Sequence, residues 1–175
     1  AGDMAAYREL RRTATLANLA GEYAGAETAY RSIVNLQSRV LGQNDPALAS
    51  GLALEALMIS NQGRFAEATT MLARAESLAR HDEADATALA EVWHYQGLNL
   101  LNQRQPAAAL VLLRRAEAAY LPLAPDGTTT ASAADGLMPM DPTTRAAAYG
   151  VVEARRAEAV AYRMMDQPAE SRGAA

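Results

Sequence analysis

Hydrophobic residues between about position 41 and position 80 recur every three or four positions, the spacing of one face of an α-helix. This pattern predicts a first helix over residues 47–61 and a second helix from residue 65 onward. Gly63, within Gln62-Gly63-Arg64, provides the permissive backbone of a tight turn between them. The residues expected to face inward are Leu52, Ala56, Ile59, Phe65, Ala68, Leu72 and Ala75. Because Ala56 and Ala68 are small, we expect the two helices to pack closely.

The same layout recurs at a nearly constant spacing along the chain. Going back 42 positions from Gly63 and Ala68 leads to Gly21 and Ala26, and going forward 41 positions from Ala68 leads to Ala109. Independent amphipathic helices would share a 3.6-residue period, but their turns would not be aligned at a longer spacing. The sequence therefore predicts a helical repeat of 41 to 42 residues. The predicted repeats cover about residues 7–40, 41–80 and 84–121.

The pattern changes after the third repeat. Residues 122–142 are rich in Pro, Gly and Thr and are too numerous for an ordinary turn between repeats. We expect this insertion to be either a surface loop or a flap over the binding surface. The apolar residues available to such a flap are Leu137, Met138 and Met140. Residues 143–175 are predicted to form a partial or capping repeat, because Arg155 stands where Trp93 and Leu52 stand in the earlier units.

The composition favours an all-helical protein. Half of the 175 residues are hydrophobic, and many of these are alanine, which has the highest helix propensity. Runs of β-branched residues suited to strands are missing. Lysine is absent and arginine is the main basic residue, a bias typical of GC-rich bacterial genomes. We expect a single bacterial domain over residues 1–175 that is part of a longer protein.

Charge and missing residue types exclude several functions. The formal net charge of -4 and the isoelectric point near 5.2 argue against general nucleic-acid binding, which requires a basic face. The lack of cysteine excludes disulfides, thiolate catalysis and cysteine zinc sites. No run of about twenty apolar residues could span a bilayer.

The sequence offers little that could carry catalysis. His81 stands in a polar turn among carboxylates that lack the spacing of a calcium loop. No Ser, Cys or second His is predicted near His94, so a pair of nucleophile and base cannot be assembled there. Phosphate-binding glycine loops and dinucleotide fingerprints are absent. We therefore expect a protein that is not an enzyme and that uses neither a metal nor a cofactor.

The third repeat carries the pattern of a known family. Its spaced residues, which resemble the tetratricopeptide (TPR) repeat, are Trp93, Gly97, Leu100, Ala109, Leu113 and Ala116. The segment from Leu41-Gly42-Gln43-Asn44-Asp45-Pro46 through Gly63-Arg64-Phe65-Ala66-Glu67-Ala68 looks like the 42-residue subtype of kinesin light chains and many bacterial regulators. The resemblance covers most of residues 7–120. It implies a right-handed α-α superhelix, a TPR-like solenoid of antiparallel helix pairs. The resemblance indicates little about function, because such repeats occur in proteins with many different activities.

The resemblance also implies a concave groove lined by the first helix of each pair. Carried over to this chain, the residues expected in the groove are Arg8, Arg11, Asn18, Ser50, Leu57, Glu91, His94, Leu98 and Arg156. Further positions on the same face are Thr15, Ala53, Ser60, Leu101, Glu153, Val160 and Arg163. The ends carry arginine and the centre is small and apolar. Such a surface suits a segment with an apolar middle and acidic flanks.

The expected specificity of the groove is limited by one observation and one alternative. Leu54 and Tyr95 stand where the carboxylate-clamp members of the family have asparagine, so their specificity is not expected here. An alternative role for Arg8, Arg11 and Arg156 is only to keep an alanine-rich surface soluble.

These features predict a scaffold for protein–protein interaction. It would bind a peptide segment or a partner domain in the concave groove, as a regulatory part of a larger bacterial protein. One alternative is self-association into a homo-dimer through the helix expected over residues 143–165. A second alternative is a small helical enzyme, in which His94 would hold a metal or ligand. Neither nucleic acid nor a membrane is an expected partner.

Overall fold

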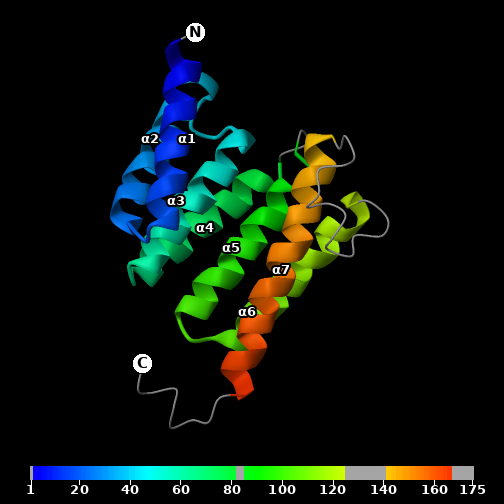
Figure 1. Ribbon diagram of the computed structural model, residues 1–175. Helices are drawn as coiled ribbons and strands as arrows, with labels where there is room; N and C mark the ends of the chain where they lie inside the picture. Colours follow the sequence, from blue (N-terminus) through cyan, green and yellow to red (C-terminus); the bar gives the residue numbers. More distant parts are fainter. Residues whose placement is uncertain (1, 82–84, 125–140, 167–175) are drawn as a thin grey trace. The chain divides into compact units, whose positions relative to one another are not determined.

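The structure of the chain, a computed structural model, describes residues 2–81, 85–124 and 141–166 (Figure 1). Every regular element in these ranges is helical, which confirms the predicted all-α class. The elements are α1 (Gly2–Leu19), α2 (Tyr23–Leu41), η1 (Pro46–Leu48), α3 (Ala49–Asn61), α4 (Phe65–Ala79), α5 (Ala88–Asn102), α6 (Pro106–Tyr120), η2 (Leu121–Leu123) and α7 (Pro142–Asp166). The residues proposed for a flap, Leu137, Met138 and Met140, lie outside the described residues.

The chain divides into two compact units, residues 1–84 and residues 85–175. The expectation of one continuous domain over residues 1–175 stays a prediction. In the first unit, α1 and α2 form one helical hairpin, α3 and α4 form another, and α2 packs against α3. The buried residues that join α1, α2 and α3 are Ala14, Ala26, Ala29, Tyr30, Ile33 and Met58.

The second hairpin forms where the hydrophobic pattern predicts it. The short helix η1 and α3 together cover residues 46–61, and α4 follows after the predicted turn. An Asp45 carboxylate oxygen accepts a hydrogen bond from the backbone N–H of Ala47 at 2.9 Å and so caps the start of this segment. Ala56 and Ala68 are fully buried, as expected where two helices approach closely.

In the second unit, α5 and α6 form a third hairpin, and α7 packs against both helices. Gly97 lets α5 approach α6, because a Cβ atom at this position would lie only 2.7 Å from the Leu113 side chain. The buried residues of α7 are mostly small: Ala147, Ala148, Val151, Ala154, Ala157 and Ala161. Trp93 is buried, whereas Arg155, aligned with it in the predicted register, is half exposed and pairs with Glu117 of α6 at 2.6 Å. The buried stripe of α7 therefore lies on neighbouring positions, and the register of the earlier repeats does not extend to position 155.

The three hairpins turn through the same backbone geometry. After the first helix of each, one residue is left-handed: Gly21 at φ 74°, Gly63 at φ 81° and Arg104 at φ 59°. The N–H of Gly63 donates to the carbonyl of Ser60 at 2.9 Å, and the N–H of Arg64 donates to the carbonyl of Ile59 at 3.2 Å. Equivalent pairs of bonds occur in the other two turns. This pattern is the Schellman motif, and its recurrence every 41 to 42 residues supports a helical repeat.

Replacing Arg104 with glycine is expected to stabilise the third turn. Arg104→Gly is expected to raise the free energy of unfolding by about 1 kcal/mol, because a residue with a Cβ atom is strained in the left-handed conformation. Gly63→Ala should lower it by about the same amount. A Cβ atom on Gly63 would meet nothing within 4 Å, so only backbone strain changes there. Urea denaturation followed by circular dichroism measures both changes. A loss of stability in Arg104→Gly would contradict the shared turn geometry.

Candidate functional site

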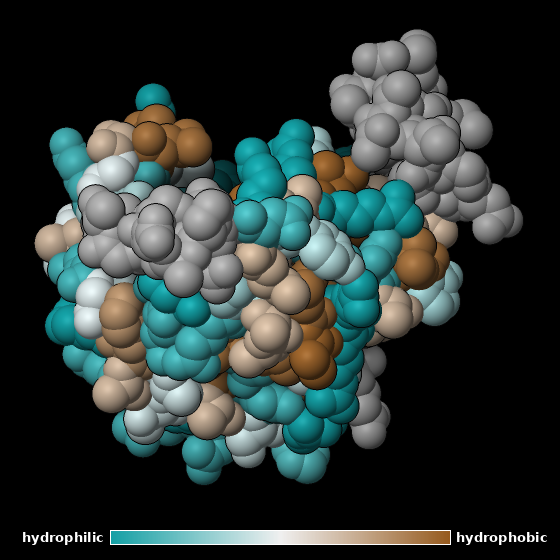
Figure 2. All heavy atoms as spheres, turned by 90° about the horizontal axis from the view of Figure 1, so that it is seen from below, coloured by the Kyte–Doolittle hydropathy of each residue, from teal (hydrophilic) through white to brown (hydrophobic). Residues whose placement is uncertain are grey.

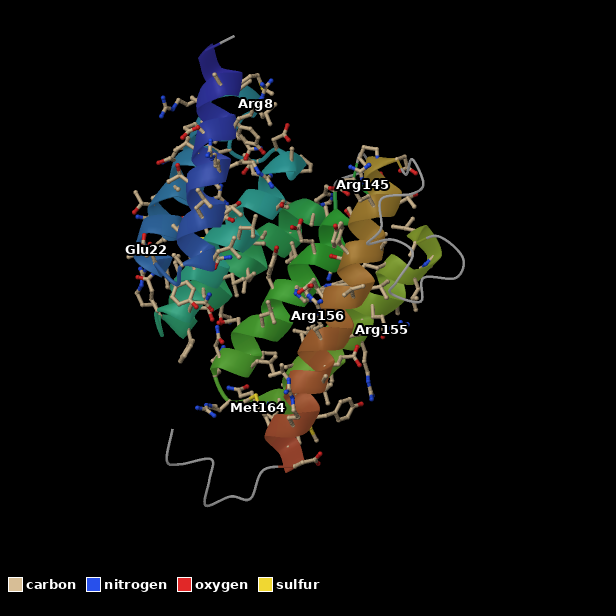
Figure 3. All side chains as sticks on the ribbon, viewed as in Figure 1. Arg8, Glu22, Arg145, Arg155, Arg156 and Met164 are labelled. Atoms are coloured by element: carbon tan, nitrogen blue, oxygen red, sulfur yellow. The ribbon has the colours of Figure 1, made fainter. Side chains whose placement is uncertain are left out.

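The residues predicted to line the groove fall in both units. Those in the first unit, on α1 and α3, are Arg8, Arg11, Asn18, Ser50 and Leu57, and those in the second, on α5 and α7, are Glu91, His94, Leu98 and Arg156. Leu57 and Leu98 pack against the hydrophobic interiors of their own units, and Asn18 is half-buried. Arg8 is exposed on α1 (Figure 3).

Several further positions expected on this face are unavailable to an acidic partner. Ala53, Ser60 and Leu101 are buried. Arg156 is exposed, but its guanidinium pairs with Glu153 at 2.7 Å. Figure 3 shows Arg156 and Arg155 leaving α7 toward different sides, with Arg155 engaged by Glu117 of α6. Both arginines therefore already have a carboxylate partner within the second unit.

The first unit has a small pocket of about 80 Å³ between α1, α2 and the start of α3, which we call the α1–α3 pocket. Its lining includes Tyr7, Arg11, Ile33, Gln37, Ser50 and Leu54. Arg11 and Ser50 are predicted groove residues. Arg11 donates a hydrogen bond to the Tyr7 hydroxyl at 3.4 Å, and its guanidinium lies 6.0 Å from the centre of the Tyr7 ring. The side-chain oxygen of Gln37 is buried without a hydrogen-bond partner among the described residues.

The second unit has a larger pocket of about 320 Å³, which we call the α5–α7 pocket. Its lining residues are Asp85, Thr87, Glu91, His94, Tyr95, Tyr120, Ala146, Tyr149, Gly150 and Glu153. Glu91 and His94 are predicted groove residues, and Glu153 lies on the same predicted face. Sequence reasoning missed Tyr120 and Tyr149. Tyr120 ends α6, a second helix of a hairpin, and only the packing of α7 against α6 brings it into this pocket.

Carboxylates dominate the polar lining of the α5–α7 pocket. They come from Asp85, Glu91 and Glu153, and no Lys or Arg is among the described residues that line it. Asp85 accepts hydrogen bonds from the backbone N–H and the hydroxyl of Thr87 at 2.8 and 2.6 Å. Burial, together with the charges of Glu91 and Asp85, raises the pKa of Tyr120 far above its usual range. The Tyr120 hydroxyl therefore stays neutral in this pocket.

His94 is the least satisfied polar residue of this pocket. It is 9% exposed, and its Nδ1 is buried with no hydrogen-bond partner among the described residues. Burial lowers the pKa of the imidazole below its ordinary value, although the charge of Glu153 acts in the opposite direction. His94 is therefore neutral at pH 7. Leaving a buried polar atom unpaired costs about 1–3 kcal/mol, so this position carries a stability cost that a ligand could offset.

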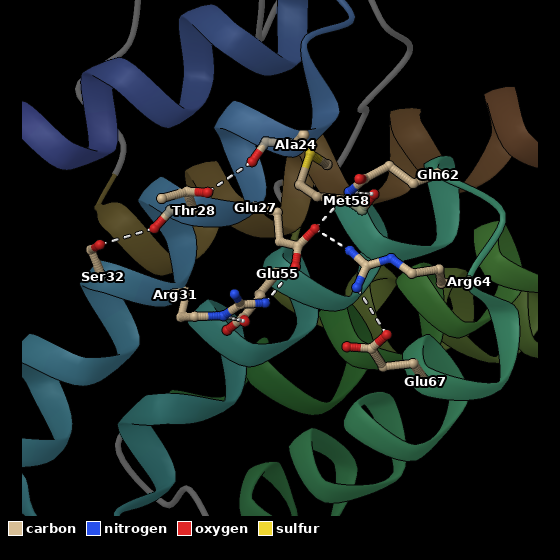
Figure 4. Close-up of polar contacts among 10 residues, drawn as sticks. All are labelled: Ala24, Glu27, Thr28, Arg31, Ser32, Glu55, Met58, Gln62, Arg64 and Glu67. Carbon is tan, nitrogen blue, oxygen red and sulfur yellow. Dashed lines mark hydrogen bonds and ion pairs between the residues drawn. The ribbon is translucent and has the colours of Figure 1, made fainter.

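A second cluster of charged residues, in the first unit, is built into the protein interior (Figure 4). Glu27 of α2 and Glu55 of α3 are 6% and 3% exposed. Arg31 pairs with Glu27 and donates to Glu55 at 2.9 Å, while Arg64 also pairs with Glu27. Gln62 donates at 2.7 Å to the same Glu27 carboxylate oxygen that Arg64 contacts. This network ties α2 to α3 and to the turn before α4.

The network shifts the two buried carboxyl groups in opposite directions. Burial would raise the pKa of Glu27, but the hydrogen bond from Gln62 and the charges of Arg64 and Arg31 outweigh it, so the pKa lies below its ordinary value. Burial raises the pKa of Glu55 above its ordinary value, and its bond to Arg31 offsets only part of that effect. Every carboxylate here has a cation or amide partner from the protein itself, so we assign this network to stability rather than to ligand binding.

The described residues contain neither a cluster of metal-ligating side chains nor a membrane-spanning helix. No group of three or more His, Asp or Glu side chains in residues 2–81, 85–124 and 141–166 could hold a metal ion. None of the helices in these ranges has the length and apolarity required to cross a bilayer. On the face shown in Figure 2, hydrophobic residues form several separate patches between hydrophilic ones. The visible apolar surface therefore does not mark one extended docking site.

Comparison with known proteins gives no match to a protein-family model and no match to a curated protein.

Proposed function

We propose that this chain is a TPR-like interaction module that binds a peptide segment of a partner protein along the first helices of its hairpins. In this proposal the hairpins stack as a right-handed superhelix of the 42-residue, kinesin-light-chain-like kind. The recurrence of one turn geometry at Gly21, Gly63 and Arg104 supports such a repeat. As in other modules of this kind, the domain would act as a regulatory part of a larger bacterial protein.

The observation that carries the proposal is the position of two pockets, the α1–α3 pocket and the α5–α7 pocket. The α1–α3 pocket takes lining residues from the first helices of both hairpins of its unit. The α5–α7 pocket likewise takes lining residues from the first helix α5 and from α7, the helix expected to begin a fourth repeat. Both pockets contain residues that the family resemblance assigns to the groove, Arg11 and Ser50 in one and Glu91 and His94 in the other.

The sizes of the pockets fit side chains of an extended peptide. A pocket of about 80 Å³ takes a small group, and one of about 320 Å³ takes a long or aromatic side chain. Peptide recognition of this kind obtains specificity from pockets that receive separate side chains. The exposed ring of Tyr149, at 62%, offers amphipathic contact area at the mouth of the larger pocket.

Selection from a random 12-residue peptide library displayed on phage, with the full chain as target, tests this function. Peptides recovered from the library should bind the wild type. They should lose about tenfold or more in affinity to Arg11→Ala or Tyr149→Ala, measured by fluorescence polarisation. Both residues are exposed, so these changes should leave the fold intact.

Matched controls are available on the same helices. Arg12→Ala removes the exposed arginine next to Arg11, and Tyr162→Ala removes a partly exposed tyrosine of α7 outside the pocket. Both should bind the selected peptides like the wild type. The proposal is wrong if the library yields no binder, or if the controls weaken binding as much as the pocket variants do.

A further inference from the structure

We propose that the α5–α7 pocket receives a positively charged side chain, an arginine or a lysine, of the bound peptide. This inference rests on the proposed peptide-binding function and adds the chemistry of one recognised residue. It also reverses, for this part of the chain, the sequence-based expectation of an acidic flank.

The carboxylates of the pocket are the first reason. Asp85 precedes α5, Glu91 lies in the first turn of α5, and Glu153 lies on α7, so three separate segments contribute negative charge to one pocket. Asp85 already accepts from Thr87, and Glu91 accepts from the Tyr95 hydroxyl at 3.4 Å. Carboxylates accept charge-assisted hydrogen bonds from the N–H groups of a guanidinium or ammonium.

The tyrosines are the second reason. Tyr95, Tyr120 and Tyr149 come from α5, α6 and α7 and line the same pocket. The face of an aromatic ring attracts a cation, and the attraction grows when the cation is partly removed from water. A cationic side chain in this pocket can therefore lie against rings while its head contacts the carboxylates. An anionic side chain would meet three like charges instead.

His94 is the third and independent reason. Its ring lines the pocket and is nine-tenths buried, yet Nδ1 has no hydrogen-bond partner among the described residues. A neutral imidazole accepts a hydrogen bond through its unprotonated nitrogen. Arginine and lysine bring only donors, so they match the carboxylates of this pocket and the acceptor nitrogen of His94.

The geometry and size of the pocket favour an organic cation over a metal ion. In the described residues, the carboxylates and His94 are not arranged to hold a metal ion. A pocket of about 320 Å³ instead suits a long organic side chain. Arg156 pairs with Glu153 at 2.7 Å, so a protein guanidinium already occupies one carboxylate next to the pocket. A cation from the peptide would compete with Arg156 for Glu153.

Because of this competition, loss of Glu153 should weaken binding of a cation and loss of Arg156 should strengthen it. Binding of an acidic side chain would give the opposite changes in affinity. The probe is N-acetyl-arginine amide, titrated into the ¹⁵N-labelled full chain and followed by NMR chemical shifts. Saturable shifts are expected at Glu91, His94 and Tyr149, with a Kd on the order of millimolar and a strong dependence on salt. Glu153→Gln should weaken binding about fivefold or more, whereas Arg156→Gln should strengthen it.

The neutral analogue and the control variant complete the experiment. N-acetyl-citrulline amide, which has the same shape without the charge, should bind at least about tenfold more weakly. Glu22→Gln changes an exposed carboxylate of the first unit and should leave the titration unchanged. Equal shifts from the citrulline analogue, or weaker binding by Arg156→Gln, would overturn the inference.

Replacing each arginine and lysine of a library-selected peptide with citrulline or glutamine separates this inference from the proposed function. If the selected peptide binds through Arg11 and Tyr149 but ignores these replacements, the cationic residue is wrong and peptide binding stands. If no peptide binds, the proposed function fails, whatever the small probe does.

Discussion

Replacing Arg31 with methionine is expected to lower the free energy of unfolding of the first unit by about 3 kcal/mol at pH 7. Arg31 is the cation that pairs with both Glu27 and Glu55, whose side chains are only 8% and 4% exposed. Methionine has a similar length but removes the charge, so Glu55 is left as a buried carboxylate without its arginine. The estimate takes the lower end for a broken buried pair, because Arg31 itself is half exposed.

The same substitution should change the pH dependence of stability. Without Arg31, the folded-state pKa values of Glu27 and Glu55 should both be higher than in the wild type. A carboxyl group whose folded-state pKa is raised destabilises the fold when ionised, and protonation relieves this as pH falls through that pKa. The deficit of Arg31→Met should therefore be larger near pH 7 than near pH 5.

Urea denaturation and hydrogen exchange measure this effect in the full chain. Exchange of peptides from α2, α3 and α4 should speed up in Arg31→Met, while peptides from α5 to α7 should not change. Arg31→Lys keeps a charge and should lose less. Arg12→Met makes the same substitution at an exposed position of α1, and its free energy of unfolding should stay within about 0.5 kcal/mol of the wild-type value. An Arg31→Met protein as stable as the wild type would show that the network does not hold α2 to α3.

Gly150→Val is expected to lower the stability of the second unit by about 2–3 kcal/mol. A Cβ atom at position 150 would lie 2.5 Å from two atoms of the Tyr120 ring. That ring is 4% exposed and rigid, so it cannot turn away without disturbing the packing of α6 against α7. The small gain in helix propensity from replacing a glycine is less than this cost.

Fluorescence of Trp93 follows this unfolding, because it is the single tryptophan of the chain and packs in the same cluster as Tyr120. Ala159→Val introduces the same side chain at an exposed position of α7 and should cost only about 0.5 kcal/mol. If the two variants were equally stable, α7 would not contact Tyr120 as described.

The helices and turns of the hairpins could be predicted from the sequence because their signals are local. Gly63 follows an apolar stripe, and a left-handed glycine after such a stripe ends a helix. Arg104 has no such local signal, since arginine rarely adopts φ 59°. The 41-residue spacing from Gly63 and the helix-starting Pro106 indicate that a turn belongs there.

The features that depend on packing could not be predicted in this way. A buried glutamate such as Glu27 looks the same in sequence as an exposed one, and its partner Arg64 lies on another helix pair. Gly150 and Tyr120 meet because α7 packs on α6, which no spacing rule specifies. The sequence shows that Arg155 departs from the register of the earlier repeats, but the cause of the departure depends on packing: α7 buries an alanine stripe of its own rather than the positions aligned with Trp93.

The candidate site could be predicted in part. The family resemblance selects Glu91 and His94, and the structure places both in one pocket. The resemblance does not select Tyr149, because no clamp position of the family corresponds to it. Nor does it reveal that Arg156 is already paired, a contact that depends on the side chains of α7 alone.

The measurement that tests peptide binding along the first helices most directly is an NMR map of contacts between the full chain and a library-selected peptide. Intermolecular nuclear Overhauser effects should connect the peptide to a pocket residue, Tyr7 of α1 in the first unit or Tyr149 of α7 in the second. In the α5–α7 pocket, the contacting residue should be an arginine or a lysine. Contacts confined to the exposed residues Val40 of α2 and Val111 of α6, on the second helices of the hairpins, would contradict the account.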